Sequence, residues 1–89
     1  MKAIVTVVGK DQVGIIASVC VKLAEYNVNV LDISQTVMQG YFTMMMVADV
    51  SACLVPLAEL VGIMDEMGKE KGLSIRLQRE DIFEAMHRV

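Results

Sequence analysis

The chain has 89 residues with a formal charge of −3, and 55% of its residues are hydrophobic. This length predicts one small domain. Phosphate binding requires a basic patch, so the acidic balance of this chain disfavours nucleic acid as a main partner. No apolar run approaches the roughly 20 residues of a membrane span, and the excess of apolar side chains over one small core predicts contact with another subunit.

The chain begins with a strand, a loop and a helix. Residues 2–8 are β-branched and apolar, which is typical of a strand. A loop follows from Gly9 to Gly14. From residue 15 to about residue 26 apolar side chains recur at the spacing of an amphipathic helix, and Asn27 is a suitable residue to end it because Asn tolerates the left-handed conformation.

A hairpin and a long helical segment come next. Residues 28–38 and 41–50 read as strands joined by the turn Gln39-Gly40. The pattern predicts a helix over residues 51–72, with Pro56 in its first turn and a glycine at its end.

The last part of the chain reads as a strand and a short helix. Residues 73–80 alternate apolar and polar, as a half-buried strand does, and residues 81–89 read as a short helix. The element order is β-α-β-β-α-β with a tail. This predicts an α+β, ferredoxin-like fold: a four-stranded antiparallel sheet with two helices on one face. We assign residues 1–80 to the domain and 81–89 to a tail that packs on the domain or on its partner.

Both faces of the predicted central strands are largely apolar. A strand with one wet face should alternate, but residues 2–8 and 41–50 carry apolar side chains on both sides. The open face of the sheet is therefore expected to be covered by the tail or by a second chain. We expect an oligomer, a two-fold homodimer first and a tetramer as the larger alternative.

The sequence VVGKDQVGII at residues 7–16 raises the question of a ligand loop. Gly9 and Gly14 have the separation of a phosphate-binding P-loop, but Ile15 and Ile16 occupy the places of its Lys and Ser/Thr. The loop has neither a G-x-G-x-x-G dinucleotide motif nor the C-x-x-C of copper-chaperone domains. Phosphate chemistry is therefore disfavoured.

Other catalytic and binding chemistries also find little support. Gly40, Tyr41 and Phe42 faintly echo the aromatic motif of RNA-recognition domains, but Met and Val fill its later positions. His87 is the single histidine and has no obvious partner. We expect no enzyme activity, no cofactor and no metal. Two cysteines among apolar neighbours in helix-like segments, Cys20 and Cys53, favour a reducing cytoplasm over a disulfide framework.

Two features are compatible with binding a small molecule. Gly14 leaves the first amides of the following helix accessible, at the positive end of its dipole, where a carboxylate fits. Asp32 lies among strand apolars, where it could meet an ammonium group. The simpler alternatives remain open: Asp11 as a turn or capping residue, the glycines as turn glycines, and Asp32 as a charge that protects an edge strand from aggregation.

Residues 7–35, VVGKDQVGIIASVCVKLAEYNVNVLDISQ, resemble the ACT domain family. The shared pattern is a strand, a G-x-D-x-x-G loop, a helix and then a strand that opens with Asn-Val. The predicted topology extends the likeness over residues 2–80. The ending REDIFEAMHRV is similar to that of small stand-alone bacterial and archaeal ACT proteins, whose chains are about this long.

The resemblance implies a regulatory module that binds an amino acid or related metabolite between two copies. The loop of one copy would face the start of the second strand of the other. Asp11 and Asn29 would contact the amino group, and the amides of residues 13–15 would contact the carboxylate. The implied ligand-binding residues are Gly9, Lys10, Asp11, Gln12, Val13, Gly14, Ile15, Asn29, Val30, Leu31 and Asp32.

One departure from the family pattern weakens the binding prediction more than the fold prediction. Many family loops carry Arg-Pro where this chain has Gln12-Val13, so this loop is less preorganised. The alternative function is a structural one, in which the fold is a dimerisation and docking surface for an enzyme partner and the pocket stays empty.

Overall fold

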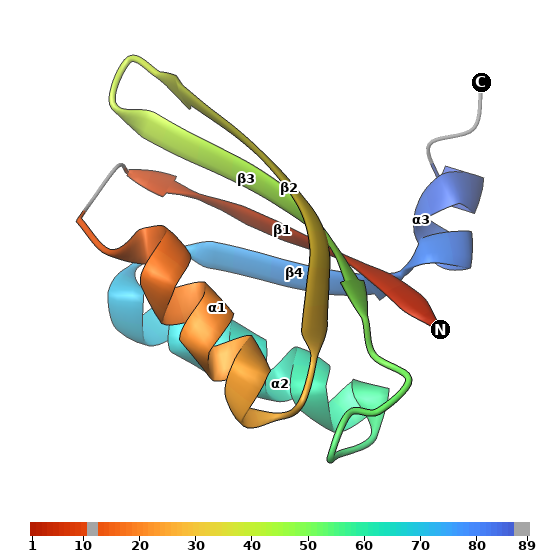
Figure 1. The fold of residues 1–89 in the computed structure, drawn as a ribbon. Helices are drawn as coiled ribbons and strands as arrows, with labels where there is room; N and C mark the ends of the chain where they lie inside the picture. The colour runs from red at the N-terminus through yellow and green to blue at the C-terminus, as the bar shows by residue number, and fades with distance from the viewer. Residues whose placement is uncertain (11–12, 87–89) are drawn as a thin grey trace.

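The protein folds into a four-stranded antiparallel sheet with two helices against one face (Figure 1). The computed structural model describes residues 1–10 and 13–86. The strand order across the sheet is β2-β3-β1-β4, which confirms the ferredoxin-like prediction. The elements are β1 (Lys2–Lys10), α1 (Ile15–Glu25), β2 (Asn29–Met38), β3 (Tyr41–Asp49), α2 (Leu57–Lys71), β4 (Ser74–Arg79) and α3 (Glu80–Met86).

The core lies between the sheet and helices α1 and α2. Alternate residues of the two central strands point toward the helices and are almost fully buried, as the period of a strand requires. Each helix adds one apolar stripe. The core side chains include Val5 and Val7 of β1, Met44 and Met46 of β3, Val19 and Leu23 of α1, and Leu60 and Met64 of α2.

Strand β1 is two residues longer than the sequence indicated. Gly9 and Lys10 pair with Phe42 and Tyr41 of β3 instead of belonging to the loop. A Cβ on Gly9 would lie 2.5 Å from Cδ2 of Leu73, so a glycine allows the chain entering β4 to pass close by. The connection from β1 to α1 is correspondingly short.

Helix α2 begins at Leu57, six residues later than predicted. Pro56 is the residue before the helix, and a proline disfavours helical geometry in the residue that precedes it. Cys53 therefore lies in the loop that precedes α2 and not in a helix, which corrects the prediction. The loop is held to the end of α1 by two hydrogen bonds, from Asn27 Nδ2 to the Ala52 carbonyl (3.0 Å) and from the Leu54 amide to the Tyr26 carbonyl (3.0 Å).

The predicted helix ends are confirmed. Asn27 follows α1 with a φ of 61°, and Gly72 ends α2 with a φ of 71°. The Leu73 amide then donates to the Gly68 carbonyl at 2.7 Å, a bond that satisfies one of the last carbonyls of α2. A left-handed residue after each helix turns the chain back toward the sheet.

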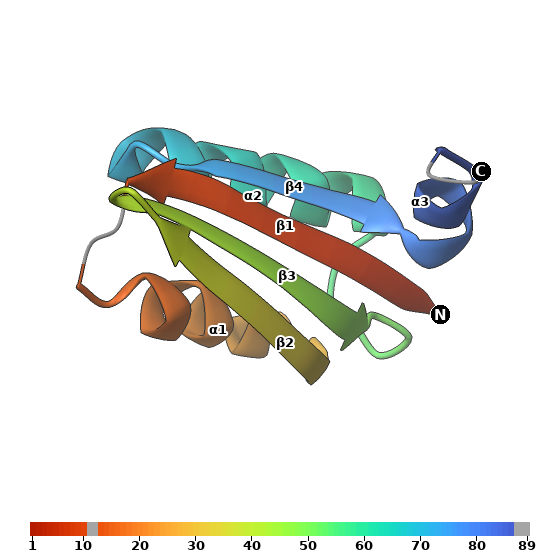
Figure 2. The ribbon, with the colours of Figure 1, turned by 90° about the horizontal axis from the view of Figure 1, so that it is seen from above.

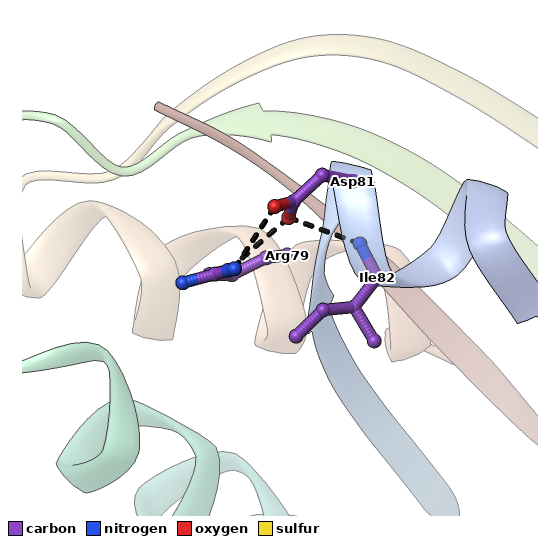
Figure 3. Close-up of polar contacts among 3 residues, drawn as sticks. All are labelled: Arg79, Asp81 and Ile82. Carbon is purple, nitrogen blue, oxygen red and sulfur yellow. Dashed lines mark hydrogen bonds and ion pairs between the residues drawn. The ribbon is translucent and has the colours of Figure 1, made fainter.

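The C-terminal helix α3 is joined to β4 by a clamp of charged groups (Figure 3). Arg79 donates from Nε and from a terminal nitrogen to the two carboxylate oxygens of Asp81, at 3.1 and 2.9 Å. Asp81 also accepts the Ile82 amide at 2.9 Å. The Arg79 guanidinium holds the pKa of Asp81 below its ordinary value. Helix α3 contacts β1 and β4; residues 87–89 of the predicted tail lie outside the described residues.

Candidate functional site

The first half of the predicted site is the turn that leads into α1. Gly14 occupies the N-cap position of α1 with a φ of 84°. Because glycine has no side chain, no side-chain hydrogen bond caps the first amides of the helix. The Ile15, Ile16 and Ala17 amides in the first turn have no acceptor within the helix. Lys10 and Val13 are exposed beside them. Asp11 and Gln12, the other predicted residues of the loop, lie outside the described residues.

The second half of the predicted site is the start of β2. Asn29 pairs with Asp49, and Val30 pairs with Ala48. A bulge then leaves Leu31 without a partner in β3, and Asp32 resumes the pairing opposite Val47. A bulge re-aims the side chains that follow it.

The bulge sends Asp32 to the open face of the sheet. Asp32 Oδ1 accepts the amide of Ile33 at 2.9 Å, so part of its carboxylate is used locally. Asn29 pairs with Asp49 and Asp32 pairs with Val47, and these two positions of β3 share the open face because Met46 and Ala48 face the core. The bulge therefore brings both polar residues to the same face although they are three residues apart in the sequence. Asp32 also lines a small hollow of about 180 Å³ on this face with Ile4 and Met45.

Within one chain the two halves lie at opposite ends of the sheet. Lys10, which leads into the loop, pairs with Tyr41, and Tyr41 pairs with Met38 at the end of β2. Asn29 pairs with Asp49, which pairs with Lys2 at the other end. The two ends are eight residues apart along β1, about 26 Å at the rise of a strand. A single chain therefore does not bring the predicted residues together.

The surface along β2 is apolar and exposed. Strand β2 is an edge strand, with a neighbour on one side only. Three of its large apolar side chains have about half of their surface exposed: Leu31 (48%), Ile33 (40%) and Val37 (55%). The sequence predicted a strand here, with an edge position as one reading of Asp32, but it did not indicate that these apolar side chains form an exposed surface.

Other surfaces of the molecule do not contain the predicted residues. An open groove of about 690 Å³ runs between α1 and α2, lined by residues such as Ser18, Val21 and Met67 and by no described residue of the loop or of β2. Phe42 is 4% exposed and faces the core. Of the two aromatic residues that echo the motif of RNA-recognition domains, Tyr41 and Phe42, only Tyr41 could therefore stack on a base. Residues 1–10 and 13–86 contain no group of three or more His, Cys, Asp or Glu that could hold a metal ion.

The match to known proteins decides the family. The family model described as "ACT domain" matches residues 2–78. The chain belongs to the ACT domain family. A UPF0237 protein of Clostridium acetobutylicum is 55% identical over all 89 residues of both chains. A UPF0237 protein of Methanosarcina acetivorans is 48% identical over 97% of this chain and 94% of its own.

The fold comparison agrees. An ACT domain protein from Streptococcus pneumoniae superposes with a TM-score of 0.82, at 45% identity and over 94% of both chains. The ACT domain is a regulatory small-molecule-binding module, and no enzymatic activity is named for these relatives. Within the described residues no helix is long and apolar enough to cross a membrane.

Proposed function

We propose that this ACT domain is a non-enzymatic sensor that binds an amino acid or a related metabolite between two copies of the chain. The observation that carries the proposal is the separation of the two predicted half-sites, about 26 Å along the sheet. A second copy paired through β2 provides the missing half. Free, half-buried cysteines at positions 20 and 53 suit the reducing cytoplasm in which we place the protein.

A two-fold axis through the middle of β2 assembles the site. Antiparallel pairing of β2 with its copy brings the Asn29 end of one strand to the Met38 end of the other. The Met38 end lies beside Lys10 and the loop of its own chain. Each dimer then contains two equivalent sites, each with the loop of one copy and the Asn29 end of the other.

The chemistry of the two halves suits the two charged groups of an amino acid. The uncapped first turn of α1, with the positive end of the helix dipole behind it, attracts a carboxylate. The Asn29 side-chain carbonyl and the Asp11 carboxylate would accept from the ammonium group. The apolar surface along β2 stabilises the pairing of the two copies.

The first experiment is a thermal-shift panel of the twenty amino acids and common nucleotides, followed by calorimetry on any compound that raises the melting temperature. A ligand at 100 times its Kd adds roughly 2.7 kcal/mol of stability, and about 1 kcal/mol moves the midpoint by roughly 4–8 °C in a domain of this size. We expect one class of amino acid to raise the midpoint. Asn29→Ala should remove that shift, and Gln78→Ala, on the opposite edge of the sheet, should keep it.

A flat panel would contradict the sensor proposal for the compounds tested. A flat panel together with an intact dimer in Asp11→Ala would favour the docking function, in which the same β2 surface assembles the protein and an enzyme partner occupies another face. Co-purification of one enzyme at fixed stoichiometry would support that alternative further.

A further inference from the structure

Helix α1 turns an uncharged side toward the edge strand β2. Seen from above in Figure 2, α1 lies on the β2 side of the molecule and α2 on the β4 side. The two charged residues of α1, Lys22 and Glu25, form an ion pair at 3.8 Å and line the groove that faces α2. The period of a helix places Ile16 and Cys20 on the other side of α1, where both are half-buried against the core.

Strand β2 also presents uncharged side chains on its helix side. Ile33 and Val37 pair with Met46 and Phe42 of β3, and because these partners face the core, Ile33 and Val37 project toward the helices. They are 40% and 55% exposed, so part of each remains accessible beside α1. Gln35, which pairs with the core residue Met44, lies between them on the same side and is also uncharged.

The charged residues nearby in the sequence lie on the other face of the sheet. Asp32, the charged residue of β2, pairs with Val47 on the open face. Lys10 at the end of β1 pairs with Tyr41, whose neighbour Phe42 faces the core, so Lys10 also belongs to the open face. Strand β2 and helix α1 therefore present no charge to the space between them.

We propose that this space holds the side chain of the ligand, and that the site selects an amino acid with an apolar side chain. The inference rests on the proposed function and deepens it, because it names the class of amino acid. A ligand with its carboxylate at the start of α1 lies beside Ile16 and Val37. In the paired dimer Val30 of the second copy, which pairs with the core residue Ala48 and so lies on the helix side, comes opposite Val37.

The selectivity follows from the cost of taking polar groups out of water. A charged side chain would lose its hydration in this space without gaining a partner, so aspartate, glutamate, lysine and arginine are rejected most strongly. A hydrophobic site discriminates less against a side chain that adds a hydroxyl or lacks a methylene, by about 10–200-fold. The expected order of affinity is therefore apolar, then hydroxyl-bearing, then charged.

The test is calorimetry of the dimer with pairs of amino acids that share their ammonium and carboxylate groups and have side chains of similar size. Valine is compared with threonine, and leucine with asparagine and aspartate. Each pair is measured on the unmodified chain and on two variants. Val37→Thr adds a hydroxyl to the wall of the space at nearly constant volume. Val21→Thr is the matched control, because Val21 is 59% exposed on α1 but lines the groove toward α2.

We expect valine and leucine to bind at least tenfold more tightly than their polar counterparts. Val37→Thr should reduce this preference at least threefold, and Val21→Thr should preserve it. A charged or hydroxyl-bearing amino acid as the tightest ligand overturns the inference and leaves the sensor function standing. An equal preference in Val37→Thr and Val21→Thr also overturns it, whereas no binding of any amino acid overturns both claims.

Light scattering checks that each variant is as dimeric as the unmodified chain at the concentration used. If Val37→Thr weakens the dimer, Ile16→Thr on α1 replaces it under the same criteria, because it adds a hydroxyl to the opposite wall of the same space.

Discussion

The two edges of the sheet differ in length, chemistry and protection. Strand β2 has ten residues, carries exposed apolar side chains and lies open along one side. Strand β4 has six residues, carries Arg76 and Arg79, and runs directly into α3. Short, charged edges resist strand pairing, and long apolar edges promote it. The contrast supports the proposed use of β2, and not of β4, for assembly.

The largest expected effect concerns how closely α2 packs on the β4 side. A Cβ on Gly68 would lie 2.6 Å from the Leu73 carbonyl oxygen, a backbone atom that cannot move freely. Gly68→Ala should therefore lower the free energy of unfolding by about 1–3 kcal/mol. Gly62→Ala in the same helix is the control: no atom lies within 4 Å of its Cβ position. That substitution should raise stability by up to about 1 kcal/mol.

Urea denaturation at one fixed protein concentration measures both glycine variants. If Gly68→Ala were as stable as Gly62→Ala, the close approach of α2 to β4 would be wrong.

A smaller effect is expected at the β2 edge. Val37 is 55% exposed and faces the helix side of the sheet, opposite Phe42. Val37→Lys places a charge on the apolar surface along β2, next to the Asn29 end of the second copy, where pairing of the two copies would take the charge out of water. We expect the dimer dissociation constant to rise at least tenfold, which corresponds to about 1.4 kcal/mol.

Light scattering after size-exclusion chromatography gives this result directly. Val61→Lys on α2 serves as the control for an added lysine at an apolar surface position. A dimer of undiminished stability in Val37→Lys would exclude the β2 edge as the assembly surface.

The smallest effect concerns the end of β4. Arg79 holds the pKa of Asp81 below its ordinary value of about 3.8. For a carboxyl group whose pKa is lowered by folding, the stabilising contribution is complete above the unfolded value and is lost as the pH falls through the folded value. The clamp should thus be intact at neutral pH and should be lost only below about pH 4.

Hydrogen exchange of the α3 amides tests the clamp. Asp81→Asn should exchange faster than the unmodified protein at pH 6, and the difference should shrink in acid. Glu84→Gln removes a charge from the same helix without touching Arg79 and should change little. Equal protection of α3 in Asp81→Asn would show that the clamp does not hold the helix.

The order of the elements could be predicted from the sequence because hydrophobic periodicity and glycine positions are local signals. The two misplaced boundaries depend on information that is not local. Gly9 and Lys10 extend β1 because β3 offers them partners, and the start of α2 is set by Pro56 and by the bonds that tie the preceding loop to α1. A helical pattern alone does not contain those contacts.

The candidate site was less predictable than the fold. The residues on each side of the pocket could be named from the family pattern, but their distance depends on the register of three strands. Asn29 and Asp32 share the open face because of a bulge that the alternation of apolar and polar residues did not indicate. The exposed apolar surface along β2 became visible only once the strand was known to lie at the edge.

The central claim is that each ligand site takes its loop from one copy and its strand from another. The most direct measurement is calorimetric complementation with the amino acid that gives the largest thermal shift. Asp11→Ala and Asn29→Ala should each abolish binding alone. After the two variants are mixed in equal amounts and exchange subunits, half of the dimers are mixed and each contains one intact site. We predict that about a quarter of the original binding stoichiometry returns. If mixing restores no binding although subunits exchange, the site is not shared between copies and the account is contradicted.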